Sequence, residues 1–170
     1  LGRATRDAKP KAGKAPYPLV VVSHGYTGSR FLMTYLTENL ASKGYVVVSI
    51  AHTESTFDNA GPFTSTLYFR PIDIRFTIDE MARMRGTGSG SFLTGLTAAN
   101  NTAIIGYSMG GYGVLNVGGA GYSPGFGAFV SGRTGGSTAI NRHIIGNEAY
   151  TGADPRVKAV VAFAPWGKKS

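Results

Sequence analysis

The chain has 170 residues, of which 42% are apolar and 15% are charged, and it contains no cysteine. This length and composition suit one domain with a packed core, and they exclude a disulfide framework, a thiolate metal site and a cysteine nucleophile. The net charge of +8 does not indicate a nucleic-acid partner, because five of the 17 basic residues lie in residues 1–16 and no basic run with interleaved aromatics follows. No apolar stretch approaches the roughly 18 residues of a membrane-spanning helix.

Residues 1–16 are basic, carry Pro and Gly and show no apolar period, so we expect an arm or connection ahead of a domain that occupies 17–170. Within that domain, short apolar runs rich in β-branched residues predict strands. The strands are expected at 18–24, 45–50, 102–107 and 157–163.

Between these runs, three segments place apolar residues at helical spacing. They are 31–40, a segment that Pro71 opens and that continues to Met81, and 109–117. Ser29 is the expected N-cap of the first helix, and Gly44 stands just after its end.

Two further segments are expected to be irregular. Asn100 and Asn101 are typical of a turn, and residues 118–152 contain ten glycines without a clear period. We expect this second segment to be a glycine-rich insertion or loop.

The strand runs are continuously apolar and do not alternate with polar residues, which indicates a sheet that is covered on both faces. Strands that alternate with helices indicate crossover connections and parallel pairing. We therefore predict an α/β fold with a doubly wound, mostly parallel sheet. In such sheets, ligands bind at the carboxyl ends of the strands.

Two segments match the pattern Gly-x-Ser-x-Gly, at 106–110 and 121–125. In hydrolases this pattern holds a nucleophilic serine on a tight turn between a strand and a helix. Ser108 has a predicted strand before it and a helical segment after it, whereas Ser123 lacks the strand and precedes Pro124, which has no N–H to donate. We predict that Ser108 is the nucleophile and that Ser123 is a loop serine. The alternative for Ser108 is a turn whose small residues serve packing alone.

A second loop, SHGYTG at residues 23–28, follows the first predicted strand. Acyl transfer needs two N–H donors aimed at the developing oxyanion. We expect Tyr26 in this loop and Met109, the residue after the nucleophile, to supply them, while Gly25 lets the backbone approach closely. The alternative is an ordinary strand-to-helix turn.

Several stretches together resemble the dienelactone-hydrolase-like members of the α/β-hydrolase superfamily. They are residues 23–56, RPIDIRFTIDEM at 70–81, IIGYSMGGYG at 104–113 and DPRVKAVVAFAPW at 154–166. The branch related to platelet-activating-factor acetylhydrolase is closest, through the Arg-Pro-x-Asp-Ile and Asp-Pro-Arg-x-Lys-Ala segments. HGYTG, LASKGYVVV, GYSMGG and APW also resemble bacterial cutinases and polyester hydrolases. The resemblance implies a carboxylic-ester hydrolase that uses Ser, His and Asp, without metal or cofactor, on a small-molecule or polymeric ester.

The resemblance to polyester hydrolases also implies that Tyr26 and Trp166 flank the acyl site. His24 lies in the SHGYTG loop and His52 ends a predicted strand, so both are candidates to line the cleft, as is Tyr107 beside the serine.

The sequence offers no convincing acid or base. In α/β-hydrolases both follow the serine along the chain, but His143 precedes the last predicted strand and is expected to be a loop or surface residue. Asp154 also precedes that strand, at the end opposite the site, and Ala164 stands where the acetylhydrolase branch has its acid. We expect the acid and base to lie beyond residue 170. Residues 17–170 would then be the front portion of a domain that further sequence or a second polypeptide completes.

Other functions stay open at this point. The lack of an acid and a base would also suit a catalytically inactive hydrolase fold used for binding, and the same serine would suit a cutinase-type or polyesterase-type enzyme or an acyltransferase. The absence of cysteine does not identify the compartment, and secretion is the favoured interpretation.

Overall fold

The computed structural model describes residues 2–147 and 151–167. Its strands are β1 (Tyr17–Ser23), β2 (Val46–Ile50), β3 (Ser55–Thr56), β4 (Asn59–Ala60), β5 (Thr97–Tyr107) and β6 (Val157–Phe163). Its helices are α1 (Thr34–Ser42), α2 (Phe63–Met84), α3 (Met109–Val117), α4 (Pro124–Arg133) and the 3-10 helix η1 (Ala139–His143). In the part of the chain that is described, no helix is long and apolar enough to cross a membrane.

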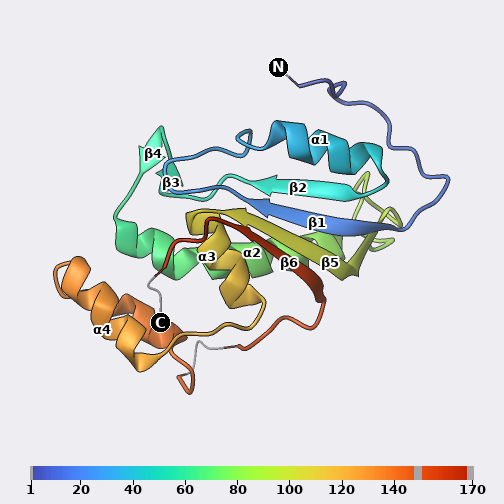
Figure 1. Ribbon diagram of the computed structural model, residues 1–170. Helices are drawn as coiled ribbons and strands as arrows, with labels where there is room; N and C mark the ends of the chain where they lie inside the picture. Colours follow the sequence, from blue (N-terminus) through green and yellow to red (C-terminus); the bar gives the residue numbers. More distant parts are fainter. Residues whose placement is uncertain (1, 148–150, 168–170) are drawn as a thin grey trace.

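Four strands form one parallel sheet in the order β2-β1-β5-β6, and β3 pairs with β4 in a small antiparallel hairpin. Helix α1 covers one face of the sheet, and α2 and α3 cover the other (Figure 1). The predicted α/β class with a doubly wound, mostly parallel sheet is confirmed. The carboxyl ends of β1 and β5 lie side by side, because Ser23 is in register with Gly106.

Strand β1 supplies the centre of both apolar layers. Leu19 and Val21 pack in the cluster that includes residues of α2 and α3, such as Ile74 and Val114. Val20 and Val22 pack in the cluster beneath α1. Because successive side chains of a strand point to opposite faces, a continuous apolar run is what a doubly covered strand requires.

The first and third predicted helices are close to the observed ones. Helix α3 has the expected bounds, and Gly44 after α1 has φ +92°, a conformation that glycine adopts without steric cost. Helix α1 begins later than expected, after a turn in which the Ser29 hydroxyl accepts a hydrogen bond from the Phe31 N–H (3.0 Å).

The second helix was predicted to begin at Pro71, and that start is wrong. Helix α2 begins at Phe63 and contains Pro71 in its interior. Proline has no N–H, so the Leu67 carbonyl, four residues earlier, loses its usual helical donor. The buried Tyr112 hydroxyl of α3 donates to this carbonyl instead (3.0 Å). A residue distant in the sequence therefore stabilises the helix across its proline.

The expected turn at Asn100 and Asn101 is instead an irregular part of β5. Pro18 pairs with Ala98, but the next residue of β1, Leu19, pairs with Thr102. The intervening residues of β5 bulge out of the ladder, which allows a longer strand than the apolar run alone predicts.

The glycine-rich segment 118–152 contains α4 and η1 within its described residues. Ser123, predicted to be a loop serine, is the N-cap of α4, and its hydroxyl accepts a hydrogen bond from the Phe126 N–H (3.3 Å). Pro124 occupies the first turn of that helix, where a missing N–H costs nothing.

Candidate active site

Ser108 lies on a sharp turn at the carboxyl end of the sheet, between β5 and α3. Its φ of 52° and ψ of −113° are rare for a residue with a side chain, and such geometry persists only where the surroundings impose it. The Ser108 N–H donates to the Phe163 carbonyl of β6 (2.9 Å), and the Ser108 carbonyl accepts from the N–H groups of Tyr112 (3.1 Å) and Trp166 (2.9 Å). The backbone of Ser108 is thus fixed, while the residue stays partly exposed.

Three glycines make this turn possible through close backbone contacts. A Cβ on Gly106 would overlap the Gly110 carbonyl, and a Cβ on Gly110 would overlap the carbonyl of Ser23 at the end of β1. A Cβ on Gly111 would lie 2.9 Å from the Cα of Pro165. The glycines around the serine are therefore required because the backbones of α3, β1 and the segment after β6 meet there.

The SHGYTG loop lies directly beside the serine. A Cβ built on Gly25 would be 3.3 Å from the Cβ of Ser108, so glycine allows the two backbones to approach. Within residues 2–147 and 151–167, the N–H groups of Tyr26 and Met109 donate no hydrogen bond to another protein group. Two N–H groups without a protein acceptor among these residues thus lie on the two segments that meet at a partly exposed serine.

Aromatic side chains form a wall next to this turn. The ring of Phe63 lies 5.3 Å from that of Tyr26 and 5.1 Å from that of Trp166, both in edge-to-face contact. Phe126 and Phe129 of α4 pack on Trp166, with ring centroids 6.4 Å and 6.3 Å away. The structure therefore brings Tyr26 and Trp166 into one aromatic cluster. Phe63 and the two rings of α4 belong to no sequence motif and were not predicted.

The histidines His24 and His52 do not line an open cleft, because the two residues are only 1% and 2% exposed. The Nε2 atom of His52 lies 2.8 Å from the Ser23 hydroxyl, and its Nδ1 atom lies 2.7 Å from the carboxylate of Asp73 on α2. Both rings belong to a buried polar network behind the SHGYTG loop. The role of Asp73 was not predicted, although this residue lies in the Arg-Pro-x-Asp-Ile segment that carries the family resemblance.

Arg70 of α2 holds the same network together. Its guanidinium donates to the His24 carbonyl (2.6 Å) and to the Ser55 hydroxyl, and it lies 3.5 Å from the Ser23 hydroxyl. Burial lowers the pKa of His24 and lowers that of His52 well below its usual value, which favours the neutral form of both rings. Burial also raises the pKa of Asp73 to about 6, against the opposing effect of Arg70.

Ser23, His52 and Asp73 share the contact pattern of a Ser-His-acid triad, but their location does not suit catalysis. Ser23 is 0% exposed, so no substrate carbonyl can reach its hydroxyl. We therefore assign these contacts to the support of the loop and not to nucleophilic attack.

Three other residues were considered as site candidates from the sequence: Tyr107, His143 and Asp154. Tyr107 is 44% exposed at the end of β5. His143 was expected in a loop or at the surface, and this is wrong: it is 5% exposed, stacks on Tyr68 and has its Nε2 atom 2.8 Å from the Tyr68 carbonyl. Asp154 pairs with Arg156 before β6, at the end of the sheet opposite Ser108.

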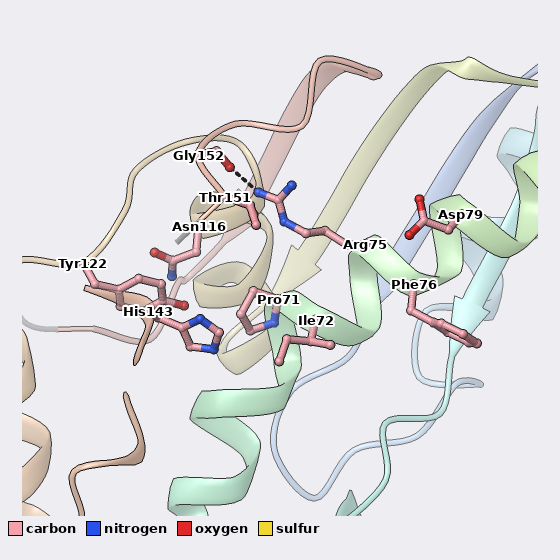
Figure 2. A pocket seen from close by; sticks show the side chains of 10 residues that line it. All are labelled: Pro71, Ile72, Arg75, Phe76, Asp79, Asn116, Tyr122, His143, Thr151 and Gly152. Atoms are coloured by element: carbon pink, nitrogen blue, oxygen red, sulfur yellow. Dashed lines mark hydrogen bonds between the residues drawn. The ribbon is translucent and has the colours of Figure 1, made fainter. Parts of the chain in front are cut away.

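A separate cavity of about 350 Å³ lies between α2, α3 and the segment around residues 151–152 (Figure 2). Arg75 reaches across it and donates to the Gly152 carbonyl. Its lining does not include Ser108, Tyr26 or Met109, so it is distinct from the candidate active site.

The raised pKa of Asp73 leads to a prediction about pH. The Asp73 carboxyl binds its proton more tightly in the folded protein than in the unfolded chain, where the pKa of an aspartate is about 3.9. The stability that Asp73 contributes is therefore complete below pH 4 and is lost as the pH rises through about 6. We expect the free energy of unfolding of the wild type, relative to Asp73→Asn, to increase between pH 7.5 and about pH 4 in denaturant titrations.

The exposed Asp58 provides the matched control. A hydrogen bond from Thr56 lowers the pKa of Asp58, so the corresponding difference for Asp58→Asn should move in the opposite direction. A stability difference for Asp73→Asn that does not change with pH would contradict the expected effect of burial on this carboxyl.

A parallel sheet with helices on both faces, and a serine held on a sharp turn between a strand and a helix, defines the α/β-hydrolase class of fold. Residues 8–126 match the model of the PET hydrolase-like family, and the chain belongs to that family.

Similar proteins include two cutinases of Thermobifida alba, Est1 and Est2. Each is 31% identical over 101 residues, which are 59% of this chain and 30% of the relative. The solved structure of a ferulic acid esterase from Streptomyces cinnamoneus matches 58% of this chain and 32% of its own, at 31% identity and a TM-score of 0.46. The match thus spans about a third of the length of these relatives. The predicted similarity to cutinases and polyester hydrolases is confirmed, and the closer likeness to the acetylhydrolase branch stays a prediction.

Proposed function

We propose that the protein is a carboxylic-ester hydrolase that forms an acyl-enzyme on Ser108. The observation that carries the proposal is the strained turn that holds a partly exposed Ser108 beside the SHGYTG loop, where the N–H groups of Tyr26 and Met109 have no protein acceptor among the described residues. Membership of the PET hydrolase-like family and the similarity to two cutinases support an ester as the substrate.

In the proposed reaction, the Ser108 hydroxyl oxygen attacks the ester carbonyl carbon, and the carbonyl oxygen becomes an oxyanion that the two N–H groups bind. When the tetrahedral intermediate collapses, the bond between the acyl carbon and the alcohol oxygen breaks, and the alcohol leaves with the proton that the Ser108 hydroxyl lost during the attack. Water then hydrolyses the acyl-enzyme and regenerates Ser108.

We propose that the histidine base and its acid are supplied by sequence beyond residue 170. The three histidines of this chain support this proposal, because each ring already has at least one nitrogen in contact with another group: His24 with the Gly25 carbonyl, His52 with the Ser23 hydroxyl and His143 with the Tyr68 carbonyl. Among the described residues, neither His24 nor His52 forms a hydrogen bond with Ser108.

The aromatic wall supports a preference for flat, apolar groups next to the scissile bond. Tyr26, Phe63 and Trp166 present ring faces and edges within one continuous cluster, which suits an aromatic or extended acyl group. This holds for a small-molecule ester and for an exposed segment of a polyester.

The proposal is tested by labelling the full-length protein with a fluorophosphonate and mapping the modified peptide by mass spectrometry. We expect the label on Ser108, together with hydrolysis of p-nitrophenyl esters. A label on another serine would contradict the proposal, and an absence of labelling would favour an inactive binding protein. Product analysis with water and a competing alcohol separates a hydrolase from an acyltransferase.

A further inference from the structure

We propose that His24 is a positioning residue of the oxyanion site: its ring fixes the Gly25–Tyr26 peptide so that the Tyr26 N–H points toward the substrate oxygen. The inference rests on the proposed function, because it assigns a role within the reaction at Ser108. It follows from the hydrogen bonds around one carbonyl group, that of Gly25.

The Gly25 carbonyl is held by two donors. The Nδ1 atom of His24 lies 2.6 Å from this oxygen, and the Gly28 N–H donates to it at 3.0 Å. In a planar trans peptide the carbonyl and the following N–H point in opposite directions. Fixing the Gly25 carbonyl on one side therefore directs the Tyr26 N–H to the other side.

The proton of the His24 ring is placed by its neighbours. The His52 backbone N–H donates to Nε2 of His24 (3.3 Å), so Nε2 carries a lone pair and Nδ1 carries the proton that is donated to Gly25. The residue is 1% exposed, and Arg70 holds the His24 carbonyl at 2.6 Å. Both the backbone and the ring of His24 are thus fixed.

The residues that hold His24 in place are themselves in contact with a residue of α2. The two ring nitrogens of His52 lie against Asp73 and Ser23, and the backbone N–H of His52 donates a hydrogen bond to the ring of His24. The rings of the two histidines are 5.2 Å apart and in edge-to-face contact. A chain of contacts therefore runs from the half-buried Asp73 on α2, through the buried His52 and His24, to the peptide beside Ser108.

The test compares three replacements of His24 in the full-length protein. In His24→Asn, the side-chain amide reaches the place of Nδ1 and can still donate to Gly25. In His24→Gln, the amide reaches the place of Nε2, where it can keep the contact with His52 but not the bond to Gly25. His24→Leu removes both contacts and keeps a side chain of similar size.

We expect His24→Gln and His24→Leu to lower kcat about 100-fold with KM changed by less than about threefold, because a misdirected oxyanion donor affects the transition state and not substrate binding. His24→Asn should keep kcat within about tenfold of the wild type. A boronic acid, whose adduct with serine places an oxygen at the oxyanion site, should lose affinity in parallel with kcat.

The matched control is His143, a buried histidine whose Nε2 atom also lies against a backbone carbonyl. His143→Leu should lower the free energy of unfolding but leave kcat within about threefold of the wild type. If His24→Leu does not fold, the comparison of His24→Asn with His24→Gln decides the question.

Equal kcat values for folded His24→Gln and wild type would overturn the inference, and so would equal losses in the Asn and Gln variants. Failure of the proposed function has a different signature, because the wild type would then show no label on Ser108 and no esterase activity.

Discussion

Replacing Ser108 with alanine should lower kcat for ester hydrolysis by at least about 10⁴-fold, because the route through an acyl-enzyme is removed. KM should stay close to that of the wild type, since the aromatic wall and the proposed oxyanion donors remain in place. Steady-state kinetics on a p-nitrophenyl ester, with the background hydrolysis subtracted, measures both quantities.

Ser123→Ala is the matched control, because Ser123 is the serine of the second Gly-x-Ser-x-Gly segment. It caps α4, so its removal should cost about 1 kcal/mol of stability and leave kcat unchanged. Activity that survives in Ser108→Ala and disappears in Ser123→Ala would show that the wrong serine has been assigned.

Replacing Gly110 with alanine should lower the free energy of unfolding by at least about 3 kcal/mol or prevent folding. The added Cβ would overlap the carbonyl of Ser23, a backbone group that side-chain rotation cannot move away. Denaturant titration of the purified variant, or its soluble yield if it does not fold, gives the result.

Gly125 is the equivalent glycine of the second segment and provides the comparison. The nearest atom to a Cβ at Gly125 is the Ser123 hydroxyl oxygen at 3.9 Å, and alanine favours the helix that contains this position. Gly125→Ala should therefore fold with equal or greater stability. A Gly110→Ala variant as stable as the wild type would contradict the close contact between α3 and β1.

The sheet and the serine turn could be predicted because their causes are local. Continuous runs of β-branched residues such as 18–24 suit a strand that is buried on both faces, and β1 occupies almost this range. Glycines on both sides of Ser108 indicate a tight turn, and α3 begins where the pattern places it.

The start of α2 and the roles of the histidines could not be predicted because distant residues decide them. Pro71 normally marks a helix start, but the Tyr112 hydroxyl satisfies the carbonyl that the proline leaves without a donor. Likewise, the protonation and burial of His24 depend on His52 and Arg70, which no local pattern connects to it.

The serine turn and the aromatic wall differ in how readily their residues can be substituted. The serine turn depends on close backbone contacts at Gly106 and Gly110, where any side chain would overlap a backbone carbonyl. The wall is built from side chains, and α4 contributes to it through Phe126 and Phe129. The match to the family model ends at residue 126, inside α4. Libraries that aim to change the proposed substrate preference therefore belong on α4, where the rings can be exchanged without altering the backbone contacts that hold Ser108.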